Sequence, residues 1–218
     1  MSVMRRTVIA VADNPVISRA FHTEAIRHRL VDRFVAGETL DSALGAASGF
    51  ATEGITTTLD LLGENVASPE QAQAAVASYQ VILPAMQERG LEPNISVKLT
   101  MLGLDFGEDV ARANMEAILE SARTAGGFVR VDMEGSAYTS VTMRLFEDLH
   151  ARFPEQVGIV IQAYLHRAAD DVERAIELGA RVRLVKGAYA EPPDAGTPGS
   201  RSRPVQEIVR AGPRTTAW

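Results

Sequence analysis

The chain has 218 residues, 46% of them apolar and 23% charged, a composition that is usual for a soluble globular domain. Its formal charge of −6 argues against a general nucleic-acid-binding protein, which would need a basic face. Because the chain has no cysteine, a disulfide framework and a thiolate metal site are both excluded, and we predict no metal site. No apolar run approaches the roughly 18 residues of a membrane span. We therefore expect a cytoplasmic protein, with peripheral contact to the inner face of the cell membrane left open.

Residues 1–50 are predicted to form an N-terminal helical segment. Asn14 and Pro15 are typical of a helix start, as the capping residue and the first helical residue. Apolar residues then recur at helical spacing from Ile17 to Phe34, and Gly37 ends the pattern.

Residues 51–190 alternate short apolar runs with longer amphipathic stretches. Strands are predicted at residues 55–62, 94–99, 128–133, 158–163 and 181–185. The helices between them are predicted at residues 68–89, 108–124, 140–153 and 168–178, the first opening on a capping box at Ser68. Strands bridged by helices predict right-handed βαβ units and a parallel sheet. Because no G-x-G-x-x-G motif follows the first strand, a parallel (βα)8 TIM-type barrel is favoured over a doubly wound sheet.

The strand pattern stops after about five of the eight strands that such a barrel needs. Residues 191–218 contain five of the ten prolines and show little periodicity, apart from one possible helical turn at Val205 to Val209. We therefore predict an incomplete barrel followed by a disordered or frameshifted tail.

Polar residues stand near the carboxyl end of every predicted strand, where parallel barrels carry their chemistry. In chain order these residues are Asp60, Lys98, Asp132, Glu134, Gln162, Arg183 and Lys186. Lys98 and Asp132 follow adjacent strands, so we expect them to neutralise each other inside the barrel mouth. The alternative for each residue is that it simply enters solvent where its strand ends.

Lys98 and Lys186 are the two lysines among 22 basic residues. All the other basic residues in this count are arginines. A lysine therefore indicates a position where a guanidinium group cannot replace the ammonium group. Lys186 is followed by Gly187 and, two residues later, by Tyr189. Glycine lets the backbone approach a ligand, lysine can hold a phosphate, and the tyrosine could stack on a ring or pack under the loop.

Five short motifs in this order, LDLLGE, SVKLT, VDMEGSAYT, IQAYL and VRLVKGAY, resemble the proline dehydrogenase family, including the corresponding domain of bifunctional proline utilisation proteins. The resemblance runs from about Arg33 to Tyr189. It implies a distorted (βα)8 barrel that holds FAD non-covalently. It also implies oxidation of L-proline at C5 to 1-pyrroline-5-carboxylate, with hydride transfer to flavin N5 and electrons passed on to a quinone.

The resemblance also implies roles for individual residues. Lys98 corresponds to the residue that contacts the substrate carboxylate, and Asp132 to its polar partner. Arg183 corresponds to the arginine beside flavin N5, and Gln162 to a partner of the isoalloxazine edge. The stretch that lines the cofactor corresponds to Val185, Lys186, Gly187 and Tyr189.

The sequence departs from the family pattern after Tyr189. It lacks the Thr-His pair that helps to hold FAD and the later helix with a tyrosine and two arginines that clamp the proline carboxylate. We hypothesise that the reading frame shifts near Pro193 and that this chain is a truncated copy.

Two other functions are compatible with the residues. Lys186 at a strand end could form a Schiff base, as in class I aldolases, if it were desolvated. The chain could also be a non-catalytic fragment. Nothing in the sequence indicates a protein partner.

Overall fold

The computed structural model describes residues 35–37 and 39–196, which fall into two compact units divided between Gly54 and Ile55. In the first unit, helix α4 spans Leu40–Thr52. Thr39 caps it, because the Thr39 hydroxyl accepts from the Ser42 amide at 3.2 Å and the Ser42 hydroxyl accepts from the Thr39 amide at 3.3 Å. The helix predicted to begin at Asn14 lies outside the described residues.

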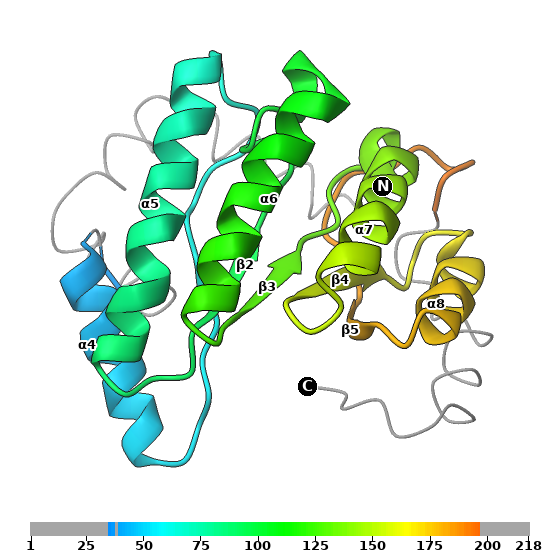
Figure 1. The fold of residues 1–218 in the computed structure, drawn as a ribbon. Helices are drawn as coiled ribbons and strands as arrows, with labels where there is room; N and C mark the ends of the chain where they lie inside the picture. Colours follow the sequence, from blue (N-terminus) through cyan, green and yellow to red (C-terminus); the bar gives the residue numbers. More distant parts are fainter. Residues whose placement is uncertain (1–34, 38, 197–218) are drawn as a thin grey trace, which may run out of the picture. The chain divides into compact units, whose positions relative to one another are not determined.

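In the second unit, five parallel strands pair in the order in which they occur along the chain (Figure 1). The strands are β1 (Leu59–Asp60), β2 (Asn94–Val97), β3 (Phe128–Val131), β4 (Val157–Gln162) and β5 (Arg181–Val185). The helices between them are α5 (Pro69–Glu88), α6 (Glu108–Thr124), α7 (Ser136–Arg152) and α8 (Ala168–Glu177), with a 3₁₀ turn η1 at Leu104–Phe106. Consecutive parallel pairing with a helix in each crossover is the arrangement of a parallel α/β barrel.

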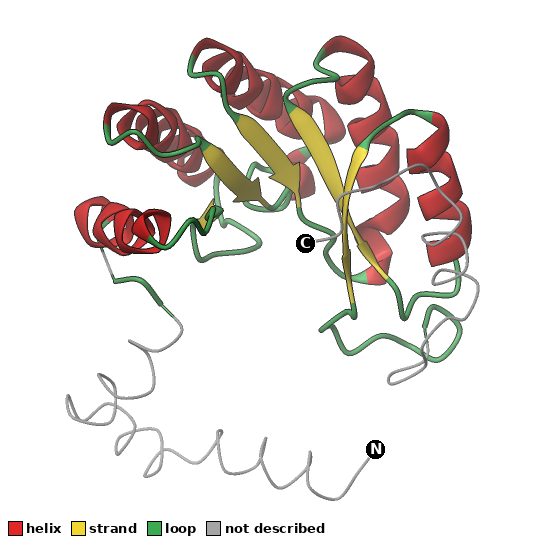
Figure 2. Cartoon of the chain, turned by 90° about the horizontal axis from the view of Figure 1, so that it is seen from below, coloured by secondary structure: helices red, strands yellow, loops and turns green. Residues whose placement is uncertain are grey.

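The sheet is curved, and the helices lie on its convex side (Figure 2). Arg183 of β5 donates from Nη2 to the hydroxyl of Thr58, just before β1, at 3.1 Å. Since β1 and β5 are the two edges of the sheet, this bond crosses its concave face. The five strands therefore form part of a barrel wall, as the sequence predicted.

Alternation along the strands separates an apolar face from a polar one. Val129 and Val131 of β3 are fully buried in the layer between the sheet and the helices. Arg130 and Asp132 alternate with them and face the concave side. The hydrophobic core thus lies outside the curve, and polar side chains gather inside it.

Two helix starts differ from the predicted ones in ways that their hydrogen bonds explain. At α5 the Ser68 hydroxyl accepts from the Gln71 amide, but the Gln71 side chain accepts from the amide of Ala67 instead of closing the predicted capping box. Helix α7 begins at Ser136, four residues before the predicted start at 140. The reason is that the Glu191 carboxylate accepts from the Ser136 amide at 2.9 Å.

The segment from Glu191 to Gly196 is described and contacts the loop that follows β4. Gly196 pairs with Leu165 in an antiparallel bridge, and Glu191 also accepts from the Tyr164 hydroxyl at 3.2 Å. The rest of the predicted tail, including the turn at Val205 to Val209, lies outside the described residues, so the boundary at residue 190 stays a prediction. Across the described ranges, none of the helices has the length and apolar character to cross a bilayer.

Replacing Gly158 by alanine is expected to destabilise the second unit. A Cβ at Gly158 would lie 2.5 Å from the Arg181 carbonyl oxygen and 2.6 Å from Cζ of Phe128. Overpacking of this kind costs about 1–3 kcal/mol, so the midpoint of urea unfolding should fall. Gly135→Ala is the matched control, since its Cβ would meet no atom closer than 3.9 Å. Equal midpoints for the two variants would contradict the packing described.

Candidate functional site

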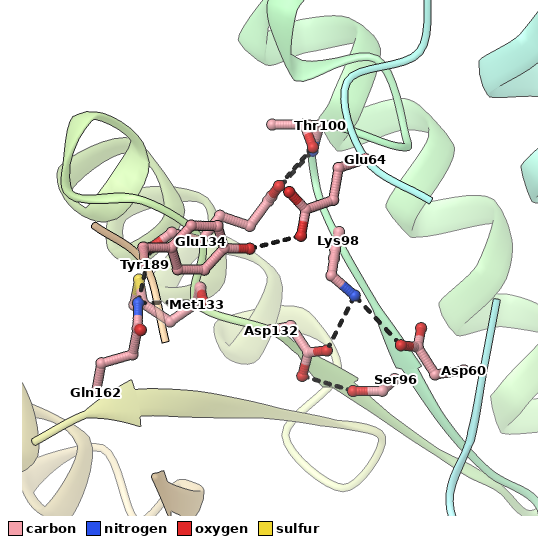
Figure 3. A network of polar contacts seen from close by, with 10 residues as sticks. All are labelled: Asp60, Glu64, Ser96, Lys98, Thr100, Asp132, Met133, Glu134, Gln162 and Tyr189. Carbon is pink, nitrogen blue, oxygen red and sulfur yellow. Dashed lines mark hydrogen bonds and ion pairs between the residues drawn. The ribbon is translucent and has the colours of Figure 1, made fainter. Parts of the chain in front are cut away.

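Lys98 lies between two carboxylates where β1, β2 and β3 end (Figure 3). Its Nζ is 3.2 Å from Oδ2 of Asp60 and 3.7 Å from Oδ2 of Asp132. The other oxygen of Asp132 accepts from the buried Ser96 hydroxyl at 2.6 Å. The predicted pairing of Lys98 with Asp132 is present, and Asp60 joins it.

The electrostatics of this cluster keep Lys98 charged. Burial acts to lower the pKa of Lys98, but Asp60 and Asp132 outweigh it, and the pKa is raised above its usual 10.5. Burial raises the pKa of Asp60, and the repulsion of Asp132 adds to this, although Lys98 opposes both. Lys98 thus forms ion pairs with both carboxylates, and its side chain remains 16% exposed on the concave side.

Glu134 is a third, more deeply buried carboxylate beside this cluster. It is 2% exposed and accepts from the Thr100 amide at 3.1 Å and from the Thr100 hydroxyl. That hydroxyl in turn accepts from the Asn65 amide at 3.1 Å, which joins the loop after β1 to the loop after β2. Burial raises the pKa of Glu134, and the hydrogen bonds from Thr100 offset only part of the rise.

Gln162 joins the loops that follow β3 and β5. Its Nε2 donates to the main-chain oxygens of Met133 at 3.3 Å and Glu134 at 2.8 Å. Its Oε1 accepts from the Ala188 amide at 3.3 Å. Both amide hydrogens are therefore engaged within the protein, so the side chain fixes the loop that carries Lys186 to Tyr189.

The residues after β5 form a turn at the edge of the site. Lys186 is exposed, and Arg183 is half-buried on Thr58. Gly187 has φ +104°, and a Cβ there would lie 1.9 Å from the Tyr164 ring, so this position requires glycine. Val185 ends the strand at the register partner of Gln162.

Tyr189 links this turn to the loop after β1. Its hydroxyl donates to Oε1 of Glu64 at 2.6 Å (Figure 3). Burial and the Glu64 carboxylate both raise the pKa of Tyr189, so the phenol stays protonated. This bond joins the loops that follow β1 and β5, at the carboxyl ends of the strands. It adds to the Arg183–Thr58 bond between the two edge strands.

Sequence reasoning missed several of these residues. Ser96 lies two residues before Lys98 in a strand. Because successive side chains of a strand point to opposite faces, the sequence could have placed Ser96 and Lys98 on the same face. Glu64 stands inside the LDLLGE motif but had no assigned role. The links through Asn65 and Thr100 depend on loop conformations that no local pattern encodes. Among the described residues, no contact joins Arg183 or Lys186 to the Lys98 cluster.

Glu134→Gln is expected to change how stability depends on pH. The folded-state pKa of Glu134 is raised, so the fold favours the protonated form, and the wild type loses stability as pH rises from the unfolded value near 4.5. The glutamine variant lacks this loss. Its free energy of unfolding, measured by urea at several pH values, should therefore improve relative to wild type as the pH rises from 4 to 7. Glu173→Gln, at an exposed position of α8, is the control; a parallel pH course for both variants would contradict the assignment.

A family model described as proline dehydrogenase matches residues 43–207. Proline dehydrogenase of Deinococcus radiodurans is 34% identical over 198 residues, which cover 89% of this chain and 63% of that protein. Proline dehydrogenase 1 of Bacillus subtilis strain 168 is 37% identical over 169 residues, covering 78% of this chain and 56% of that protein. The crystal structure of proline utilization A from Bdellovibrio bacteriovorus, inactivated by N-propargylglycine, superposes with a TM-score of 0.68 at 28% identity, over 76% of this chain and 21% of that one.

The chain therefore spans somewhat more than half the length of the two curated relatives. The family match continues past Pro193 to residue 207, so the hypothesis of a frameshift near Pro193 gains no support from it. The matched range contains all five strands and every residue of the Lys98 cluster. The chain belongs to the proline dehydrogenase family.

Proposed function

We propose that this chain carries the greater part of the substrate and flavin sites of an FAD-dependent L-proline dehydrogenase. The reaction is oxidation of L-proline to 1-pyrroline-5-carboxylate, with electrons passed to a quinone. The observation that carries the proposal is Lys98 held between Asp60 and Asp132 at the carboxyl ends of three consecutive strands. Family membership supports the reaction class, and the quinone rests on the family resemblance alone.

The charges of the Lys98 cluster suit a zwitterionic amino acid. The ammonium group of Lys98 can bind the carboxylate of proline as a charge-assisted hydrogen-bond donor. Asp60 and Asp132 bring two negative charges against one positive charge, and the excess favours the secondary ammonium of proline. Ser96 holds Asp132 in place while this exchange of partners occurs. Lys98 thereby orients the substrate, and the carboxylates position its amine end.

The turn after β5 fits an anionic cofactor. Arg183 and Lys186 supply positive charge, and Gly187 lets the turn that carries Lys186 pack against the Tyr164 ring. When bound, FAD supplies the acceptor for the hydride that leaves C5 of proline. Val185 ends β5 just before this turn, and Tyr189 on the turn is fixed by Glu64. We propose that Arg183 stabilises negative charge that develops next to it during the reaction.

Gln162 has a constrained role in this proposal. Because its two amide hydrogens bond the backbone after β3, a contact with the isoalloxazine edge would have to use Oε1. We assign Gln162 first to holding the cofactor-side loop through Ala188. Contact with the flavin is the second part of its proposed role.

The structure favours proline oxidation over a Schiff-base mechanism. Lys186 is exposed, so it lacks the desolvation that activates a Schiff-base lysine. Lys98 is engaged by two carboxylates and stays charged, which also disfavours nucleophilic attack. Inactivity of this chain by itself is the alternative that comes from the sequence, and the flavin-bleaching measurement below decides between the two. Peripheral contact with a membrane stays a proposal that comes from the sequence.

The two lysines provide a matched pair of variants. Lys98→Met should leave FAD binding intact but weaken the response to L-proline by about 10- to 100-fold, since a charge-assisted hydrogen bond contributes about 1.5–3 kcal/mol. Lys186→Met should instead weaken FAD binding. The measurements are the dissociation constant for FAD, from flavin fluorescence, and the anaerobic bleaching of bound flavin by L-proline.

The same experiment separates the possible failures. Equal proline responses in Lys98→Met and wild type would contradict the assigned substrate site. If Lys98→Met fails to fold because Asp60 and Asp132 then repel each other, Lys98→Met combined with Asp132→Asn removes that repulsion and tests the same role. A wild-type chain that binds FAD but is not bleached by L-proline would contradict the proposed activity of this chain.

A further inference from the structure

A second group of charged side chains lies on the concave face of the sheet, nearer the amino ends of the strands than Lys98, as the strand register shows. Its members are Arg130 of β3 and Arg181 of β5. The sheet register places Gly158 of β4 directly between them, because Gly158 pairs with Arg130 on one side and with Arg181 on the other. The two arginines thus flank a position that has no side chain.

The ring of Phe128 fills the space over Gly158. A Cβ on Gly158 would lie 2.6 Å from Cζ of Phe128, so the ring rests directly on the β4 backbone. Cζ of Arg181 is 3.8 Å from the centre of this ring, and Cζ of Arg130 is 5.2 Å from it. Both guanidinium groups therefore lie against one aromatic ring.

The positive charge of this pair is not compensated within the described part of the chain. Arg130 is 5% exposed, and its Nε has no hydrogen-bond partner. No described carboxylate forms an ion pair with Arg130 or Arg181; Asp132, which attracts Arg130, already binds Ser96 and Lys98. Burial, and then repulsion by Arg183 and Arg181, lowers the pKa of Arg130 to about 10. The face of an aromatic ring attracts cations but carries no net charge to neutralise them.

We propose that Arg130 and Arg181 bind an oxyanion, a phosphate or a carboxylate, on the concave face of the sheet. Guanidinium groups match the planar oxygen pairs of both anions and can bind them with two parallel hydrogen bonds. Arg130 precedes Asp132 by two residues along β3, so the site lies about 7 Å toward the amino end from the Lys98 cluster. It is separate from the proposed proline site and does not depend on the proposed activity.

Nε–Hε signals of ¹⁵N-labelled arginine test the site directly on the full chain. Inorganic phosphate and, separately, acetate are titrated at constant ionic strength, because exposed charges are screened by salt. The Arg130 and Arg181 signals, identified by their loss in Arg130→Gln and Arg181→Gln, should shift and saturate. The signal of Arg174, a surface residue paired with Glu147, is the internal control and should not saturate.

Arg181→Gln is the decisive variant, because Arg181 is exposed and its replacement leaves the buried Arg130 in place. It should weaken the dissociation constant measured at Arg130 by about tenfold or more. Saturation by phosphate alone would identify a phosphate site, saturation by acetate alone a carboxylate site, and saturation by both a general oxyanion site. If neither anion gives a saturating shift at Arg130, or if Arg181→Gln binds as well as wild type, the proposal is wrong.

Discussion

The ion cluster of Lys98, Asp60 and Asp132 joins the carboxyl ends of three consecutive strands. Charges left unpaired at this position would be costly, since β2 and β3 are buried and no other described cation forms an ion pair with these carboxylates. Consecutive parallel pairing brings the three side chains to one edge of the sheet. The same parallel pairing places the contacts of Glu134 and Gln162 next to this cluster. The position of the candidate site therefore follows from the order of the strands in the sheet.

The concave face carries two kinds of charge at two levels. Toward the carboxyl ends, carboxylates outnumber the one lysine, which suits the amine of an amino acid. Toward the amino ends, Arg130 and Arg181 stand without carboxylate partners among the described residues, which suits an anion. The hydrogen bond from Arg183 to Thr58 crosses this face and joins the two edges of the curved sheet. The charge of the concave face therefore changes along the strands, from positive near their amino ends to mainly negative near their carboxyl ends.

Elements with strong periodicity could be predicted from the sequence, and elements that depend on distant contacts could not. Helix α6 and strand β5 have the predicted bounds, 108–124 and 181–185, because their apolar pattern and terminal signals agree. Strand β1 is two residues long where eight were predicted, since only Leu59 and Asp60 pair with β2. In the site, the Lys98–Asp132 pair followed from adjacent strand ends, whereas the Tyr189–Glu64 bond joins loops 125 residues apart and has no local signature.

The charge state of Lys98 is the most direct test of this account, and the chain is suited to it because it contains two lysines. Selective labelling of lysine with ¹³C at Cε gives two signals, and Lys98→Met assigns them. The account predicts that Lys98 titrates above its usual pKa of 10.5, and that Asp132→Asn moves the titration back toward lower pH, because one of the two attracting carboxylates is removed. A Lys98 pKa at or below 10.5 that is unchanged in Asp132→Asn would contradict the ion cluster on which the proposed proline site rests.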